Sequence, residues 1–342
     1  MTGYVIRRVL WIIVVIWAII TITFVLMHNV EGGPFSRERE LPPNVIAALN
    51  HKYGLDKPVF SVDIWNSQYG QYIGDLLPFK ADFPPFKTPD LGASYRSTDQ
   101  QVSDLIREGL WVSLQLGVMA FLFAVIVGMS MGTISALNHN RFLDYVGVFF
   151  STVGASMPNF ILGAFLIVIF AVELGWFDVL GWGGPNFDVF APLTWKNNFD
   201  PFAWDLSKVV LPVVALGVLP AAYFARITRA SMLEVLEQDY IRTARSKGLA
   251  ERIVVLRHAI KNAMVPILTV MGPYLAFLIT GSFLVETVFN IPGVGRRFVQ
   301  AVGVRDYGMI MGTTIFFAVF IALANLIVDL LYAVVDPRIR YA

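Results

Sequence analysis

One polar segment of the chain, from Glu234 to Pro266, has the residue types needed for specific recognition. Between residues 226 and 264 there are eight Lys or Arg and four Asp or Glu, and long apolar runs flank the segment on both sides. A short basic helix held between membrane spans suits docking into a groove on a soluble partner. The segment therefore predicts a protein-docking element rather than a centre of bond-making chemistry.

The spacing of apolar residues predicts two short amphipathic helices in this segment. The first has one apolar stripe at helical spacing, made by Leu233, Leu236, Tyr240 and Ala244. Its basic residues lie off that stripe and are Arg242, Arg245 and Lys247. Gly248 stops or bends this helix, because glycine has no Cβ to hinder a positive φ. The second helix has Ile253, Leu256, Ile260 and Ala263 as its apolar residues and is expected to end near Pro266.

The chain has none of the short motifs that carry nucleotide binding or hydrolysis. It lacks G-x-x-x-x-G-K-[ST], so it is not itself a P-loop ATPase, and it also lacks H-E-x-x-H and G-x-S-x-G. It contains no cysteine, and its four histidines are scattered. We therefore expect no catalytic residue, no cofactor, no metal site and no nucleic-acid partner.

Acidic residues within apolar runs bear on a rival reading, a membrane-embedded hydrolase. Asp329 is the only acid well inside a predicted span, and a single acid cannot form a catalytic dyad. We expect Asp329 to be a hydrogen-bonded residue near the cytoplasmic end of its span. Glu173 and Glu286 fall at span edges, where water is close. Enzyme activity is therefore not expected.

Composition places the chain among integral membrane proteins. Of its 342 residues, 56% are hydrophobic and 15% are charged, whereas soluble domains average about 25% charged residues. The apolar runs long enough to cross a bilayer are 9–27, 111–137, 145–172, 209–225, 265–285 and 309–335. The predicted fold class is an all-α integral membrane protein with six transmembrane helices.

Particular residues add detail to these spans. The first apolar run is longer than the roughly 7–15 residues of a signal-peptide core, so we expect it to be retained. Gly128 and Gly132 have a spacing that lets two helices approach closely. Pro158, near the middle of the third span, predicts a kink because proline removes a backbone hydrogen bond.

The distribution of charge predicts the orientation. Excess Lys and Arg mark cytoplasmic loops, so segment 226–264 and both termini are expected in the cytoplasm and residues 28–108 outside. Three arginines at 296, 297 and 305 fall on the outer side, against this rule. The predicted divisions are 1–27 as the N-terminal span, 28–108 as the extracytoplasmic segment, 109–335 as the core with its loop 226–264, and 336–342 as a cytoplasmic tail.

Two helices are predicted within the extracytoplasmic segment. Pro43 to Tyr53 has a proline at its start and Gly54 just past its end, as a short helix would. Ser97 or Thr98 is expected to cap a second helix that runs to Glu108. Either the segment simply packs as a cap, or it also serves as a landing surface for a binding protein.

The basic segment also resembles a known family. Arg242-Thr243-Ala244, then three residues and Gly248, is similar to the EAA-x3-G loop of membrane subunits of binding-protein-dependent ABC importers, although Arg242 and Thr243 replace the motif's Glu and first Ala. YGLDKPV at 53–59, DLGASY at 90–95 and ETVFNIPGVGRR at 286–297 resemble the oligopeptide and dipeptide permease branch, B-type. The resemblance extends over nearly the whole chain.

This resemblance implies a type I ABC importer transmembrane domain in a prokaryotic inner membrane. Its partners would be a second homologous permease subunit, two cytoplasmic ABC ATPase subunits and an extracytoplasmic substrate-binding protein, besides membrane lipid. The residues that the family motif and the predicted stripe assign to ATPase coupling are Leu236, Tyr240, Arg242, Thr243, Ala244 and Gly248.

Substrate and energy source leave alternatives. Peptides come first, and nickel chelates and short oligosaccharides remain open, because the binding protein largely sets the substrate in this family. An ion-coupled secondary transporter is a rival of a different class. Such carriers place ionisable residues or interrupted helices at the midplane, often in repeated halves, and the sequence has no convincing repeat.

Overall fold

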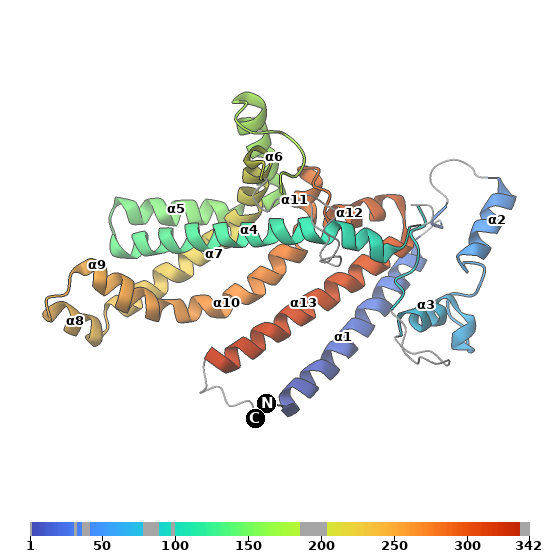
Figure 1. Ribbon diagram of the computed structural model, residues 1–342, viewed down its shortest axis with the longest axis horizontal. Coiled ribbons are helices and arrows are strands. Elements are labelled where there is room, and N and C mark those ends of the chain that lie inside the picture. Colours follow the sequence, from blue (N-terminus) through green and yellow to red (C-terminus); the bar gives the residue numbers. More distant parts are fainter. Residues whose placement is uncertain are drawn as a thin grey trace, which may run out of the picture.

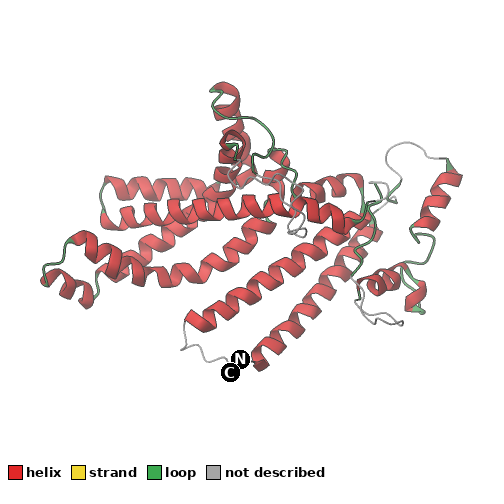
Figure 2. Ribbon diagram, in the orientation of Figure 1, coloured by secondary structure: helices red, strands yellow, loops and turns green. Residues whose placement is uncertain are grey.

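The computed structural model describes residues 2–30, 33–35, 42–77, 89–96, 100–184 and 204–335. Within these ranges the regular structure is helical apart from one isolated β-bridge, between Ala93 and Gln101 (Figure 2). The α-helices are α1 Thr2–Asn29, α2 Pro43–Lys52, α3 Gln68–Leu76, α4 Val102–Leu137, α5 Phe142–Ser156, α6 Asn159–Leu166, α7 Leu206–Leu236, α8 Asp239–Ser246, α9 Glu251–Ile253, α10 Ile260–Thr280, α11 Phe283–Val288, α12 Val294–Val304 and α13 Tyr307–Val335. A short 3-10 turn, Ile64–Asn66, and two π-helical stretches, Ile167–Glu173 and Val254–Ala259, complete the set.

Among the residues that the structure describes, five helical stretches are long and apolar enough to cross a membrane: 6–29 in α1, α4, α7, the run 251–288 from α9 to α11, and 307–326 in α13. The predicted third span is instead a bent pair, in which α5 and the stretch from Asn159 to Glu173 meet at 106°. The break lies at the expected proline, because Pro158 is the N-cap of α6 and starts a new helix. Figure 1 shows α6 standing away from the layer of α4, α5 and α7. Counting the bent pair as one gives six spans.

Within the described residues, the most extensive helix contact joins α4 to α7. A Cβ added to Gly128 would lie 2.5 Å from the carbonyl oxygen of Ala221, and one added to Gly132 would lie 2.5 Å from that of Ala225. No side chain larger than hydrogen fits at these distances, so the predicted role of both glycines is confirmed. Farther along the same pair, Leu116 and Leu216 are fully buried together with Phe289 of the segment after α11.

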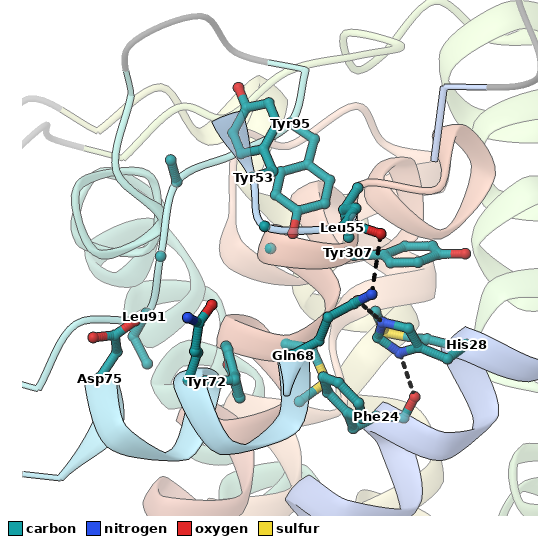
Figure 3. Close-up of a pocket in the computed structure, with 17 residues that line it drawn as sticks. Phe24, His28, Tyr53, Leu55, Gln68, Tyr72, Asp75, Leu91, Tyr95 and Tyr307 are labelled. Carbon is teal, nitrogen blue, oxygen red and sulfur yellow. Dashed lines mark hydrogen bonds between the residues drawn. The ribbon is translucent and has the colours of Figure 1, made fainter. Parts of the chain in front are cut away.

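The segment between α1 and α4 packs on the C-terminal end of α1 and the N-terminal end of α13. Phe24 and Met27 of α1 share one apolar cluster with Met311 and Ile315 of α13 and with aromatic residues of α3. A cavity of about 180 Å³ lies above this cluster (Figure 3). Its floor is fixed by Gln68, whose Nε2 donates to the carbonyls of Leu55 and Lys57, while its Oε1 lies 3.0 Å from Nε2 of His28.

The helices expected in this segment are partly as predicted. α2 begins at Pro43 and is followed by Gly54 with φ +67°, as its sequence pattern indicates. Ser97 and Thr98, the expected caps, lie outside the described residues. The helix they were expected to start begins at Val102 and does not end at Glu108, because it continues as α4. Gly109 stays within this helix, where its missing side chain lets Val294 approach.

Glu286 differs from its expected place near water. It is completely buried, and its carboxylate accepts hydrogen bonds from the hydroxyls of Ser113 and Ser282 and from the backbone N–H of Arg296. These donors come from α4, the start of α11 and α12, so the carboxylate ties three elements together. The side chain of Asp329 lies outside the described residues.

Candidate functional site

The predicted docking segment begins where α7 ends. α7 stops at Leu236, and Gln238 has extended backbone (φ −72°, ψ 148°) before α8 begins at Asp239. The expected stripe through Leu236, Tyr240 and Ala244 is therefore wrong, since it assumed one continuous helix across this break. Leu236 is half-buried on the last turn of α7, whereas Tyr240 and Ala244 belong to a separate helix.

The short helix α8 has two distinct faces. Ile241 is 0% exposed and Ala244 is buried beside it, and both pack in a cluster with Met232 of α7 and with Val254 and Val255. Tyr240 is 43% exposed, and Arg242 and Thr243 are also exposed. The sequence analysis missed Ile241. It is the one aliphatic residue between 237 and 243, and its i, i+3 spacing from Ala244 was the signal.

Gly248 ends α8 as the sequence predicts. Its φ is +76°, and its N–H donates to the carbonyl of Arg245 at 2.9 Å. A Cβ at this position would meet no atom within 4 Å, so glycine is favoured here by backbone conformation and not by lack of space. The chain then turns into α9.

An ion pair spans this turn. Nη2 of Arg245 lies 2.6 Å from Oε1 of Glu251, and Nε donates to Oε2 at 3.1 Å. Both side chains are about half exposed, so the contact orients α8 relative to α9 more than it stabilises the fold.

The second helix does not end at Pro266, because α10 continues through that residue to Thr280. Its buried face also differs from the expected one. Ile253 and Leu256 are exposed, whereas the buried residues are Val254, Val255, Ala259 and Ala263. Leu256 lies within the π-helical stretch Val254–Ala259, whose wider turn shifts the phase of the side chains that follow.

The result is a docking face, defined here as the exposed residues Tyr240, Arg242, Thr243, Leu249, Ile253 and Leu256. It combines aromatic and aliphatic side chains with flanking basic groups, a composition typical of protein contacts. In Figure 1, α8 and α9 lie at one end of the long axis, and α2 and α3 lie at the other. No group of three or more metal-ligating side chains occurs in the part of the chain that the structure describes.

Comparison with known protein families covers both parts of the chain. Residues 124–341 match the family described as "Binding-protein-dependent transport system inner membrane component", and residues 1–117 match its N-terminal counterpart. The chain belongs to this family. It is therefore a permease subunit of an ABC importer and not an enzyme, and the ATPase is a separate subunit. As a multi-pass member of this family, the permease is a protein of the bacterial inner membrane.

The permease has relatives of the same length. It is 38% identical over 341 residues to the oligopeptide transport system permease protein OppB of Haemophilus influenzae, with 100% of both chains covered. It is 39% identical over 340 residues to the dipeptide transport system permease protein DppB of Bacillus subtilis, covering 99% of this chain and 98% of the relative.

Solved structures show the same fold at low sequence identity. The inward-facing MetNI methionine ABC transporter matches with a TM-score of 0.53 at 17% identity, covering 68% of this permease and 97% of that chain. The shared fold is the type I ABC importer transmembrane domain.

Proposed function

We propose that the permease forms half of a translocation path for peptides. The support is its full-length similarity, at 38% and 39% identity, to permeases named for oligopeptide and dipeptide transport. It pairs with a second, homologous permease subunit, binds two cytoplasmic ABC ATPase subunits, and receives cargo from an external binding protein. Nickel chelates and short oligosaccharides are the other cargo classes, and no described feature favours either.

The proposed orientation places the docking face and both termini in the cytoplasm. The support is the excess of basic residues between 226 and 264. Residues 28–108 then form the extracytoplasmic segment between the N-terminal span 1–27 and the core 109–335, and residues 336–342 form the cytoplasmic tail.

α8 is the coupling helix in this proposal. Tyr240, Arg242 and Thr243 enter a cleft of the ATPase, while Ile241 and Ala244 anchor the helix to α7 and to the stretch after Gly248. The observation that carries the proposal is this division into two faces. A helix held on one side by fully buried contacts moves as a unit with the membrane helices, so motion of the cleft reaches the path. Leu236 and Gly248 set where the coupling helix begins and ends.

The test is reconstitution of the two permeases and two ATPases in proteoliposomes with the binding protein that copurifies with them. We expect uptake of a labelled peptide. This uptake should require ATP on the side of the membrane where the ATPase subunits are bound. Uptake driven by a proton or sodium gradient without ATP would overturn the proposal in favour of a secondary transporter. Uptake of nickel chelates or oligosaccharides in place of peptides would overturn the cargo class alone.

A further inference from the structure

A basic hollow of about 550 Å³ lies at the end of the molecule where α12 meets the start of α13. Three arginines line it from two elements: Arg96 from the segment before α4, and Arg296 and Arg297 from α12. The other polar lining residues are Ser94, Gln300 and Asp306. In the proposed orientation this hollow opens outside the membrane.

The three arginines are held in place in different ways, and Arg296 keeps its positive charge at the hollow. Arg96 donates through Nε and Nη2 to the carbonyl oxygen of Val304, at 3.3 and 3.2 Å. Nη2 of Arg297 lies 2.7 Å from Oε2 of Glu108. Arg296 contacts two neutral oxygens. One is the carbonyl of Asn290 at 3.5 Å, and the other is the side-chain oxygen of Gln300 at 3.3 Å, with the Gln300 amide oriented so that its oxygen faces the guanidinium.

The acidic groups nearby do not neutralise Arg296. Asp306 is buried, and its carboxylate accepts from the hydroxyl of Ser94 and from the N–H groups of Tyr95 and Met309. Glu286 accepts from the backbone of Arg296 but is turned inward, onto two serine hydroxyls. The Arg296 guanidinium is therefore a half-buried cation whose close partners carry no charge.

The position of these arginines runs against the usual distribution of charge in membrane proteins. Basic residues concentrate in cytoplasmic loops, yet here they gather on the opposite side from the loop 226–264. Arginine rather than lysine suits a carboxylate, because its planar fork binds both oxygens at once. The hollow is also lined by Leu105, Val304 and Met309, so the arginines lie among apolar side chains.

We propose that this hollow receives carboxylate side chains on the surface of the external binding protein. The inference rests on the proposed function and names where that partner docks. The argument is charge complementarity: the arginines are positioned in advance by backbone carbonyls and by Glu108, so docking costs little ordering of the side chains. A binding protein that docks here contacts α12. Glu286 links the N-terminus of this helix to α4 and α11.

The test uses the four-subunit complex in proteoliposomes and the copurifying binding protein. The variants are Arg296→Gln and Arg296→Glu, and the matched controls are Arg305→Gln and Arg305→Glu. Arg305 follows α12 and carries the same charge, but it does not line the hollow. The measurement is the concentration of binding protein that gives half-maximal stimulation of ATP hydrolysis, at low and high salt.

We expect Arg296→Glu to raise the half-maximal concentration about tenfold and to flatten its salt dependence, with the maximal rate unchanged. Replacing one surface acid of the binding protein by arginine should restore the affinity between the binding protein and the Arg296→Glu complex. The same replacement should not improve the affinity for the other variants. Equal half-maximal concentrations for the Arg296 and Arg305 variants would overturn the inference and leave the proposed function standing. If the wild-type complex is not stimulated by the binding protein, the proposed function fails as well.

Two further arms separate other carboxylate or phosphate sources. A defect that disappears when the cargo peptide is amidated at its C-terminus would mean that the hollow binds cargo, which overturns the docking proposal. A defect seen in vesicles with phosphatidylglycerol but absent in pure phosphatidylcholine would mean that it binds lipid, with the same consequence. A defect independent of both supports the binding protein as the occupant.

Discussion

Arg229 of α7 donates two hydrogen bonds to Asp144 at the start of α5, from Nε to Oδ1 at 2.6 Å and from Nη2 to Oδ2 at 2.7 Å. The same carboxylate accepts from the backbone N–H of Asn140 and from the hydroxyl of Ser135. Arg229 lies one turn before Met232, which packs under α8. The ion pair therefore fixes the turn between α4 and α5 to the part of α7 that supports α8.

Asp144→Asn should destabilise the permease by about 2 kcal/mol, because it removes the charge that accepts both hydrogen bonds from Arg229. The cost stays moderate since the Arg229 side chain is 27% exposed and can be hydrated. Thermal unfolding of the purified complex measures it. The control is Asp239→Asn, whose side chain is 97% exposed and lies 3.6 Å from Arg242. An unchanged midpoint for Asp144→Asn would show that the pair does not hold this turn.

Gly248→Asp should weaken attachment of the ATPase about tenfold while leaving insertion and pairing with the second permease intact. The backbone cost of a non-glycine residue at φ +76° is about 1 kcal/mol. Gly248→Asn has nearly the same shape and the same backbone cost without the charge, so it isolates the electrostatic part. Lys247→Gln should be mild. Wild-type transport by Gly248→Asp in the reconstituted complex would remove the docking role from this turn.

Thr243→Asp and Ala244→Asp place the same charge on opposite faces of α8. Thr243 is exposed, so its variant should fold normally and lose ATPase binding and peptide uptake. Ala244 is buried against Met232 and Val254, so its variant puts an unpaired charge in an apolar cluster and should also lower the unfolding midpoint. Binding assays and thermal unfolding, run on both, distinguish the two effects. Identical behaviour of the pair would contradict the two-faced helix.

Gly132→Ala should destabilise the contact between α4 and α7 by about 1–3 kcal/mol, because its Cβ would lie 2.5 Å from a backbone carbonyl oxygen that cannot rotate away. Gly303→Ala is the matched control in α12. A Cβ at Gly303 meets nothing within 4 Å, so alanine there should be neutral or slightly stabilising. The comparison requires only unfolding midpoints, and a midpoint for Gly132→Ala at or above that of the control contradicts the close packing.

Single-cysteine labelling tests the proposed orientation, and the chain offers a background without cysteine. Val62 is fully exposed in segment 28–108, whereas nearby Ser67 is buried and caps α3, so Val62→Cys is the suitable site for the side proposed as outer. An impermeant thiol reagent should label Val62→Cys strongly in intact cells and should label Ser246→Cys only after lysis. The reverse pattern would invert the topology.

Several features of the permease follow from local sequence, and these could be predicted. Long apolar runs place the spans, because only helices satisfy their backbone within a bilayer. Gly248 ends α8 and Gly54 follows α2 because positive φ favours glycine in any surroundings. The family motif also locates the proposed coupling segment, because the residues of the motif lie close together along the chain.

The faces of the proposed coupling segment were decided by tertiary structure. Ile241 is buried and Tyr240 exposed because α7 and the stretch after Gly248 cover one side of α8, and periodicity could not reveal the break after Leu236. Leu256 is exposed because it lies within a π-helical stretch, which the sequence pattern does not predict. Glu286 lies at a span edge in sequence but is buried, because Ser113 and the N-terminus of α12 come from distant parts of the chain to satisfy it. Local sequence determines where a helix can form and end, whereas burial depends on neighbours that only the folded chain brings together.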